Sequence, residues 1–350
     1  MSGLAGSLDL LTVPTIDLTG WAGGEPTARA AIAAELDHAC RTVGFMQIVG
    51  HGIPDSAVHD LTEAMDEFFG LPLEVKCRSI APRASINRGY TVPGSEKLSY
   101  SLGVDSPADM FEAFNIGAST ADFPDLDLDP EIYAADIWPE NNARFRDGAV
   151  GWFRHAAALA RTMTDVFTVA LGLPDGYFRP FTDHSIDVLR MVNYALPEGT
   201  DLEPDQLGMG AHTDYGIVTI LWADPVPGLQ VLDSVGVWHP VVPAPGALLV
   251  NLGDLLARWT NDRWTSTMHR VVPPTGPDGR SMRRRSAAFF HDGNADALIS
   301  TLTPCRSAEG TGYDDVTIAE HLAQKLAGSR GLELNDHASR EAARIAGASS

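Results

Sequence analysis

The chain has 350 residues and carries 46 acidic against 25 basic side chains, which gives a formal net charge of −21. Hydrophobic residues make up 44% of it, a globular composition that can bury a sizeable core. A strongly acidic protein repels phosphate backbones and anionic membrane surfaces. We therefore expect neither nucleic acid nor a membrane as a partner, and no obligate protein partner is evident.

The cysteine usage indicates a reducing compartment. Cys40, Cys77 and Cys305 match neither a disulfide framework nor a zinc site. The N-terminus lacks the basic start and apolar core of a signal peptide, and no run of 18 apolar residues occurs. The sequence therefore predicts a cytoplasmic protein.

The first third of the chain alternates helical and extended patterns. Apolar residues at helical spacing predict helices over 27–43 and 55–69, and the short apolar run 45–53 predicts a strand between them. Residues 81–107 carry glycine, proline and serine with weak periodicity. This stretch is expected to form loop and short strand.

The middle and the end of the chain have different sequence patterns from the first third. Seven acids and three prolines over 122–140 predict a surface loop, and a long helix is expected over 141–171. After residue 185, short apolar runs follow one another at intervals of roughly ten residues, as in a β-sandwich or barrel. The expected fold is mainly β with flanking helices.

Three regions are predicted on this basis. Residues 1–120 form an N-terminal helical and β region, and residues 121–326 form the core with its long supporting helix. Residues 327–350 are expected to be a polar, loosely held tail.

One set of side chains has the composition of a metal site. His212 and Asp214 are two residues apart in "GAHTDYGIVTI", and His269 follows 55 residues after Asp214. Two histidines and one carboxylate form the facial triad of non-haem Fe(II) oxygenases, which leaves three positions open on the metal. A His₂-carboxylate zinc hydrolase remains an alternative at this point.

A second motif suits an anion. In "RRRSAAFFH", Arg284 and Ser286 share one face of a predicted strand, and Arg283 and Arg285 share the other. An arginine fork binds a carboxylate through two hydrogen bonds, and a hydroxyl on the same face can add a third. The motif is suited to the distal carboxylate of a dicarboxylate such as 2-oxoglutarate, which a zinc hydrolase would not explain; an exposed basic turn is the alternative.

Taken in order, these motifs resemble the isopenicillin N synthase-like family of Fe(II)/2-oxoglutarate-dependent dioxygenases. The resemblance covers most of the chain. It rests on "VPTIDL" (13–18), "RTVGFMQIVGHGIP" (41–54), "HTDYGIVTILWADPVPGLQVLD" (212–233), "WHPVVPAPGALLVNLGDLLARWTND" (238–262), "MHRVV" (268–272) and "RRRSAAFF" (283–290).

The resemblance implies a double-stranded β-helix, a jelly-roll variant, as the core of the fold. It implies that His212, Asp214 and His269 ligate Fe(II). It also implies that Arg284 and Ser286 hold the C5 carboxylate of the cosubstrate 2-oxoglutarate.

Tyr194, in "RMVNYALPEG", resembles a family tyrosine that hydrogen-bonds the cosubstrate, with Asn193 beside it near the metal. The family usually has proline directly after this tyrosine. This chain departs from that pattern, with Ala195 and Leu196 before Pro197.

The implied reaction consumes O₂ and 2-oxoglutarate, releases succinate and CO₂, and oxidises an unactivated C–H bond of a small molecule. Hydroxylation is expected, with desaturation or ring closure as other outcomes. In the penicillin-forming branch, which uses no 2-oxoglutarate, the Arg-x-Ser motif holds a substrate carboxylate. An Fe(II) oxidase or cyclase of that kind remains an alternative, as does a catalytically inactive binding protein on the same fold.

Substrate contacts are expected from a stretch that resembles the pocket mouth of the family, residues 83–101. Arg83, Arg88 and Tyr90 lie in it and can meet an anionic group, so the substrate is expected to carry a carboxylate. Arg190 and Phe114 are further candidates. The alternatives are a solvated loop for the two arginines of this stretch, an internal ion pair for Arg190 and core packing for Phe114.

Overall fold

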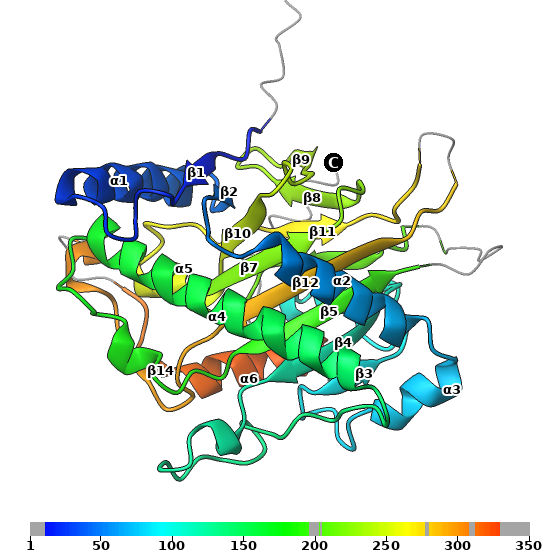
Figure 1. Cartoon of the computed structure of the whole chain (residues 1–350). Helices are drawn as coiled ribbons and strands as arrows, with labels where there is room; N and C mark the ends of the chain where they lie inside the picture. The colour runs from blue at the N-terminus through cyan, green and yellow to red at the C-terminus, as the bar shows by residue number, and fades with distance from the viewer. Residues whose placement is uncertain (1–10, 196–202, 204, 277–279, 308–311, 330–350) are drawn as a thin grey trace, which may run out of the picture.

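The computed structural model describes residues 11–195, 203, 205–276, 280–307 and 312–329. Two β-sheets form the core, and helices cover the outer face of the larger one (Figure 1). Apolar residues of both sheets, such as Val192, Tyr194, Val231 and Val271, pack together between them. This is the predicted jelly-roll arrangement.

The larger sheet has eight strands in the order β1-β2-β10-β7-β12-β5-β4-β3. In chain order they are β1 (Thr15–Asp17), β2 (Phe45–Val49), β3 (Gly89–Thr91), β4 (Glu112–Gly117), β5 (Val188–Tyr194), β7 (Val218–Ala223), β10 (Leu248–Leu252) and β12 (Arg284–His291). All neighbouring pairs are antiparallel except β1 and β2.

The smaller sheet has four strands in the order β6-β11-β8-β9. They are β6 (Met209–His212), β8 (Leu229–Leu232), β9 (Trp238–Pro240) and β11 (His269–Val271). A separate pair joins β13 (Leu298–Ile299) to β14 (Val316–Thr317).

Six α-helices occur in the described part of the chain: α1 (Pro26–Thr42), α2 (Asp55–Phe69), α3 (Leu73–Lys76), α4 (Ala143–Ala170), α5 (Asp254–Trp259) and α6 (Ile318–Ser329). Short 3₁₀ turns lie at Cys77–Ser79, Leu98–Leu102, Thr120–Asp122, Arg179–Phe181 and Thr303–Cys305. The three long N-terminal and central helices therefore lie where the sequence predicts them, within two residues at each end.

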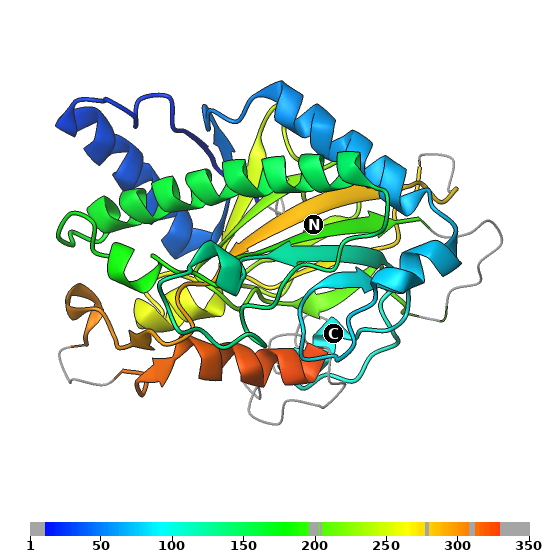
Figure 2. The same ribbon diagram turned by 60° about the horizontal axis from the view of Figure 1, so that its bottom comes forward.

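The long helix α4 runs across the large sheet with α2 beside it, while α6 lies on the other side of the molecule (Figure 2). The side chain of Asn142 caps α4 by accepting a hydrogen bond from the Phe145 amide at 3.1 Å. Gly148 lets the two helices approach closely, because a Cβ there would lie 2.7 Å from Ala64 Cβ and from Asp60 O. This close packing fixes the helical layer against the sheet.

The N-terminal region and the core share one sheet. Strands β1 and β2 pair with β10, and strands β3 and β4 pair with β5, so residues before 120 complete the same large sheet. Helix α6 extends through 327–329 and buries Ser329, so these residues are not part of a loose tail. Residues 330–350 lie outside the described ranges.

The side chains of β12 alternate strictly between the two sides of the large sheet. Arg284 and Ser286 face the interior between the sheets, and Arg283 and Arg285 contact Asp66 on α2. This alternation decides which residues of the sheet can reach the site.

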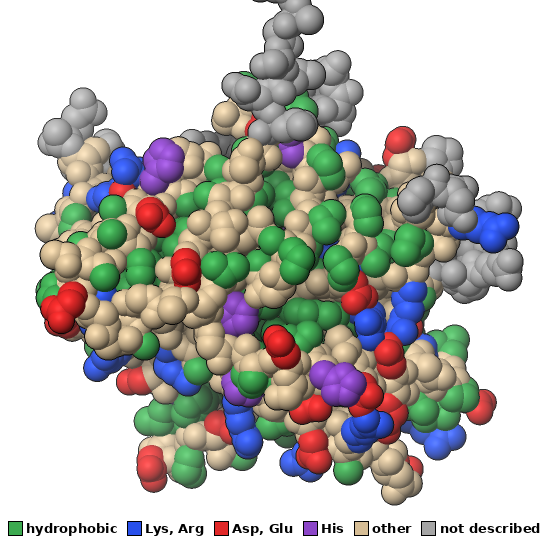
Figure 3. All heavy atoms as spheres, turned by 45° about the horizontal axis from the view of Figure 1, so that its top comes forward, with side chains coloured by type: hydrophobic (Ala, Val, Ile, Leu, Met, Phe, Trp, Pro, Cys, Tyr) green, Lys and Arg blue, Asp and Glu red, His purple; other side chains and the backbone are tan. Residues whose placement is uncertain are grey.

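On the face shown in Figure 3, acidic and basic side chains lie interspersed. None of the helices in the described ranges combines the length and the apolar character needed to cross a bilayer.

Candidate active site

His212, Asp214 and His269 come together at one end of the space between the sheets. His212 ends β6 and His269 begins β11, and the two are register partners in the small sheet. Asp214 follows β6 by two residues, and its Oδ1 lies 3.9 Å from His212 Nε2 and 3.7 Å from His269 Nε2. One ligand atom from each residue lies within 4.8 Å of the others, and all three residues are buried. These spacings and the donor set fit Fe(II).

The surroundings of the two imidazoles direct Nε2 toward this common point. Nδ1 of His212 donates to Gly210 O at 2.8 Å, and Nδ1 of His269 donates to Thr267 O at 3.1 Å. A carbonyl can only accept, so the proton stays on Nδ1 and Nε2 keeps its lone pair. Burial, and after it the neighbouring His269, lower the pKa of His212 to about 3, which favours the neutral ring that a metal needs.

The Asp214 carboxylate is oriented through Oδ2, the oxygen that does not face the two histidines. Oδ2 of Asp214 accepts from Thr219 Oγ1 at 2.5 Å and from Asn251 Nδ2 at 2.6 Å. Both donors come from adjacent strands of the large sheet, β7 and β10. Oδ1 is thereby left to face the two histidines.

A cavity of about 550 Å³ opens beside the triad. Arg284 and Ser286 line it from β12, and Tyr194 lines it from the paired strand β5. The Arg284 guanidinium is almost fully buried, and its Nε and Nη1 have no hydrogen-bond partner among the described residues. A buried cation with unpaired donors is costly unless an anion meets it. A carboxylate in the cavity would fill this need, so the residues fit the cosubstrate as well as the metal.

The side chains of Tyr194 and Asn193 point to opposite sides of the large sheet. The Tyr194 ring centroid lies 5.3 Å from Arg284 Cζ, on the cavity side. Asn193 points to the other side of the sheet, where its Nδ2 donates to Glu112 at 2.8 Å and its Oδ1 accepts from Arg283 at 2.7 Å. The position of Asn193 outside the cavity wall speaks against the predicted contact with cosubstrate or metal.

Three of the predicted substrate residues lie away from the cavity wall. Phe114 is fully buried among the aromatic rings of α2 and α4, and Tyr90, beside it in the sheet, donates to Glu112 at 2.6 Å. Arg83 is exposed and lies 3.7 Å from Glu131. These residues pack the core or face solvent, so none of them is placed to meet a substrate.

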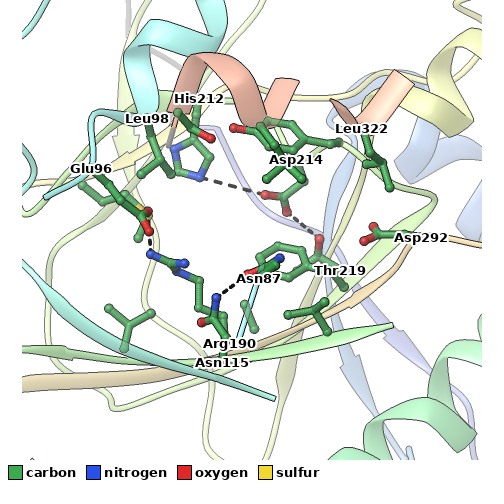
Figure 4. A pocket seen from close by; sticks show the side chains of 18 of the residues that line it. Asn87, Glu96, Leu98, Asn115, Arg190, His212, Asp214, Thr219, Asp292 and Leu322 are labelled. Atoms are coloured by element: carbon green, nitrogen blue, oxygen red, sulfur yellow. Dashed lines mark hydrogen bonds and ion pairs between the residues drawn. The ribbon is translucent and has the colours of Figure 1, made fainter. Parts of the chain in front are cut away.

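The other two candidates line the cavity but already have partners. Arg88 donates to the carbonyls of Ala134 and Ala118 and lies 3.4 Å from Asp136, so its head is held within the fold. Arg190 donates to Glu96 at 2.7 Å, and both side chains are buried. Figure 4 shows this pair on the cavity wall, with Asn115 below it.

Three further residues of the cavity wall were not predicted from the sequence: Glu96, Asn115 and Asp292. The last has a local signal, because the alternation that places Arg284 and Ser286 on the cavity continues through Ala288 and Phe290 to Asp292. Glu96 had none, since its partner Arg190 is 94 residues away.

Helix α6 closes one side of the cavity with Leu322, Ala323 and Leu326. It is held near the metal loop by Lys325, whose Nζ lies 2.9 Å from Asp254 Oδ2. The same carboxylate oxygen accepts from Thr213 Oγ1 at 2.9 Å. The docking of α6 is thus linked to the loop that carries the triad.

Comparison with known proteins agrees with this geometry. Residues 13–141 match the model described as non-haem dioxygenase in morphine synthesis N-terminal, and residues 186–293 match that of the 2OG-Fe(II) oxygenase superfamily. The chain belongs to the 2OG-Fe(II) oxygenase superfamily. The oxygenase is 32% identical over 311 residues to the 2-oxoglutarate-Fe(II) type oxidoreductase hxnY of Emericella nidulans, covering 88% of this chain and 87% of that one.

Two further relatives are similar over most of their length. The proline hydroxylase buaE of Petromyces alliaceus is 31% identical over 300 residues, covering 84% of this chain and 91% of its own. The crystal structure of a full-length Neurospora crassa protein in complex with alpha-KG and thymine superposes with a TM-score of 0.80 at 28% identity, covering 91% of this chain and 98% of that one. The protein is therefore an Fe(II)- and 2-oxoglutarate-dependent oxygenase, as the motifs predicted. The penicillin-forming, zinc and non-catalytic alternatives are set aside.

Proposed function

We propose that the oxygenase hydroxylates a C–H bond of a small molecule bound in the cavity beside the triad. The observation that carries this is the buried Arg284, whose unpaired N–H groups face the same cavity as the three metal-type ligands. Hydroxylation, rather than desaturation or ring closure, is supported by the hydroxylase name of the 31% identical relative.

We assign the residue roles as follows. His212, Asp214 and His269 hold Fe(II), which supplies O₂ activation at the expense of 2-oxoglutarate when both are bound. The carbonyls behind the two histidines and the hydrogen bonds to Asp214 Oδ2 fix the three side chains before the metal arrives. The protein thereby contributes ligand geometry rather than a proton.

Arg284 and Ser286 hold the distal carboxylate of 2-oxoglutarate, and the Tyr194 ring supports the guanidinium from the neighbouring strand. Their burial excludes water from this contact, which strengthens a charge-assisted hydrogen bond. Apolar residues on the remaining wall, including Val188, Leu221 and Leu322, hold the carbon skeleton of the substrate and keep water from the reacting C–H bond.

We do not propose a carboxylate on the substrate, although the sequence led us to expect one. Arg88 and Arg190 both have acidic partners within the fold, so in the described part of the cavity wall their charges are already balanced. The proposed substrate is therefore a small molecule for which no acidic group is specified. We infer a cytoplasmic site of action from the three free cysteines.

Substrate-dependent turnover tests the proposal. The Fe(II)-loaded protein with 2-oxoglutarate and O₂ is screened against small-molecule pools for succinate release, and products are examined by mass spectrometry after reaction in isotopically labelled O₂. The expected product carries one labelled oxygen atom, and His269→Ala forms none. His239→Gln is the control, because this buried histidine pairs with Asp233 and does not line the cavity. A product that lacks two hydrogens and has gained no oxygen would refute hydroxylation.

A further inference from the structure

Besides the metal and cosubstrate residues, the polar side chains that line the cavity include Arg190, Asn115 and Asp292. Two are satisfied internally: Arg190 pairs with Glu96, and Asn115 donates to Asn87. The third is Asp292, directly after the end of β12, and its carboxyl has no hydrogen bond or ion pair with any described residue. A carboxyl group that faces a cavity without a partner in the chain is open to hydrogen bonds from water or from a bound ligand.

The position of Asp292 is built into the fold. A Cβ on Gly216 would lie 1.9 Å from Asp292 Oδ1 and 3.0 Å from Asp292 Cα, so glycine at 216 leaves room for the carboxyl in its present orientation. Gly216 belongs to the loop that follows Asp214, and the backbone beside it is held by the bond from Ile217 N to His291 O at 3.0 Å. The carboxyl of Asp292 therefore lies against the loop that carries Asp214. Figure 4 shows it beside Thr219 and close to Leu322 of α6.

Thr219 and Leu322 lie beside Asp292 (Figure 4), and the apolar side chains of Ile186 and Phe290 line the same cavity. Burial, with the nearby Asp187 and Asp214 carboxylates, raises the pKa of Asp292 well above its usual range. A positive group opposite Asp292 would reverse this effect by stabilising the ionised carboxylate.

The charge of the substrate region points the same way. Arg190 is already paired with Glu96, and Arg284 belongs to the cosubstrate, so neither arginine balances Asp292. A cationic group on the substrate would form a neutral pair with the ionised Asp292 carboxylate, whereas a substrate carboxylate would repel it.

We propose that Asp292 is a specificity-determining residue that binds a positively charged nitrogen of the substrate, an ammonium or amidinium group attached to an apolar skeleton. The inference rests on the proposed function, because it concerns the substrate of the same site. The ammonium donates to the carboxylate, and the apolar wall formed with α6 takes the attached carbons. Asp292 thus orients the substrate relative to the metal without contacting the metal itself.

Binding under anaerobic conditions tests this directly. The protein loaded with Fe(II) and 2-oxoglutarate is titrated by calorimetry with straight-chain amines from butylamine to octylamine, each paired with the alcohol of the same length. We expect at least one amine to bind about tenfold or more tightly than its alcohol, as for a hydrogen bond between charged groups. Asp292→Asn should abolish this difference and leave the affinity for the alcohol unchanged.

The control is Glu131→Gln, which removes the same charge from the partly exposed rim of the cavity, where Glu131 bonds to Ser85. It should keep the preference for the amine. If no amine binds more tightly than its alcohol, or if Asp292→Asn keeps the difference, the inference is wrong. The visible absorption band of the Fe(II)–2-oxoglutarate complex, recorded before each titration, reports the proposed function separately; a variant that shows the band is folded and loaded.

Discussion

Arg284 allows the sharpest test of the cosubstrate site. Its Nε and Nη1 are buried without partners among the described residues, so a bound carboxylate would gain two charge-assisted hydrogen bonds. Each contributes about 1.5 kcal/mol or more, which together amounts to roughly 3 kcal/mol and about a hundredfold in affinity. We therefore expect Arg284→Met to raise the Kd for 2-oxoglutarate by about two orders of magnitude.

The same structure predicts an opposite effect on the stability of the protein without cosubstrate. An unpaired buried cation costs free energy of folding, and methionine fills a similar space without charge. Arg284→Met should therefore leave the free energy of unfolding unchanged or raise it. A loss of affinity accompanied by a loss of stability would point to misfolding instead.

The assay is an anaerobic titration of the Fe(II)-loaded protein with 2-oxoglutarate, followed by the visible charge-transfer band. Arg283→Met is the matched control, because Arg283 precedes Arg284 on the chain but points to the other side of the sheet and pairs with Asp66 at 2.6 Å. It should bind 2-oxoglutarate like the wild type. An affinity of Arg284→Met within about threefold of the wild type, a difference under about 1 kcal/mol, would refute the reasoning.

Three other perturbations test separate parts of the account. Thr219→Val removes one hydrogen bond to Asp214 Oδ2 and should weaken Fe(II) binding by about tenfold or more, measured by competition with a chelator; unchanged affinity would mean that Asn251 suffices alone. Lys325→Met leaves the largely buried Asp254, whose side chain is 14% exposed, without its cation and should lower the free energy of unfolding by about 3 kcal/mol in urea, whereas no loss would show that α6 docks by apolar contact only. Burial raises the pKa of Asp109 to about 7, so the folded protein keeps a proton that the unfolded chain releases above about pH 4. The stability from this group is full at acidic pH and is lost as pH rises toward 7; Asp109→Asn should flatten this decline, and equal slopes in both proteins would contradict the pKa shift.

The sequence predicted those parts of the site that depend on local periodicity. On β12, alternation correctly put Arg284 and Ser286 on one side and their arginine neighbours on the other. The same rule, applied to β5, would have separated Asn193 from Tyr194, because Arg190, Val192 and Tyr194 share the cavity face. Asp292 was predictable in the same way, because it continues the alternating series of β12 by one step.

Other features of the structure could not be predicted from the sequence. Five of the six residues of β4 are buried, so its pattern does not distinguish the cavity side from the helix side, and the sequence left substrate contact and core packing both open for Phe114. The pairing of Arg190 with Glu96 depends on how distant segments meet. The same is true of the first four strands, whose place in the large sheet follows from pairing with β10 and β5.

The central claim is that the triad and Arg284 together form a site for Fe(II) and 2-oxoglutarate. The most direct measurement is the visible spectrum of the protein mixed anaerobically with Fe(II) and then with 2-oxoglutarate, for the wild type and for His269→Ala. The account predicts a charge-transfer band in the wild type that appears only when both are present, and no band in His269→Ala. A wild-type protein that binds iron yet shows no band on addition of 2-oxoglutarate would contradict the account.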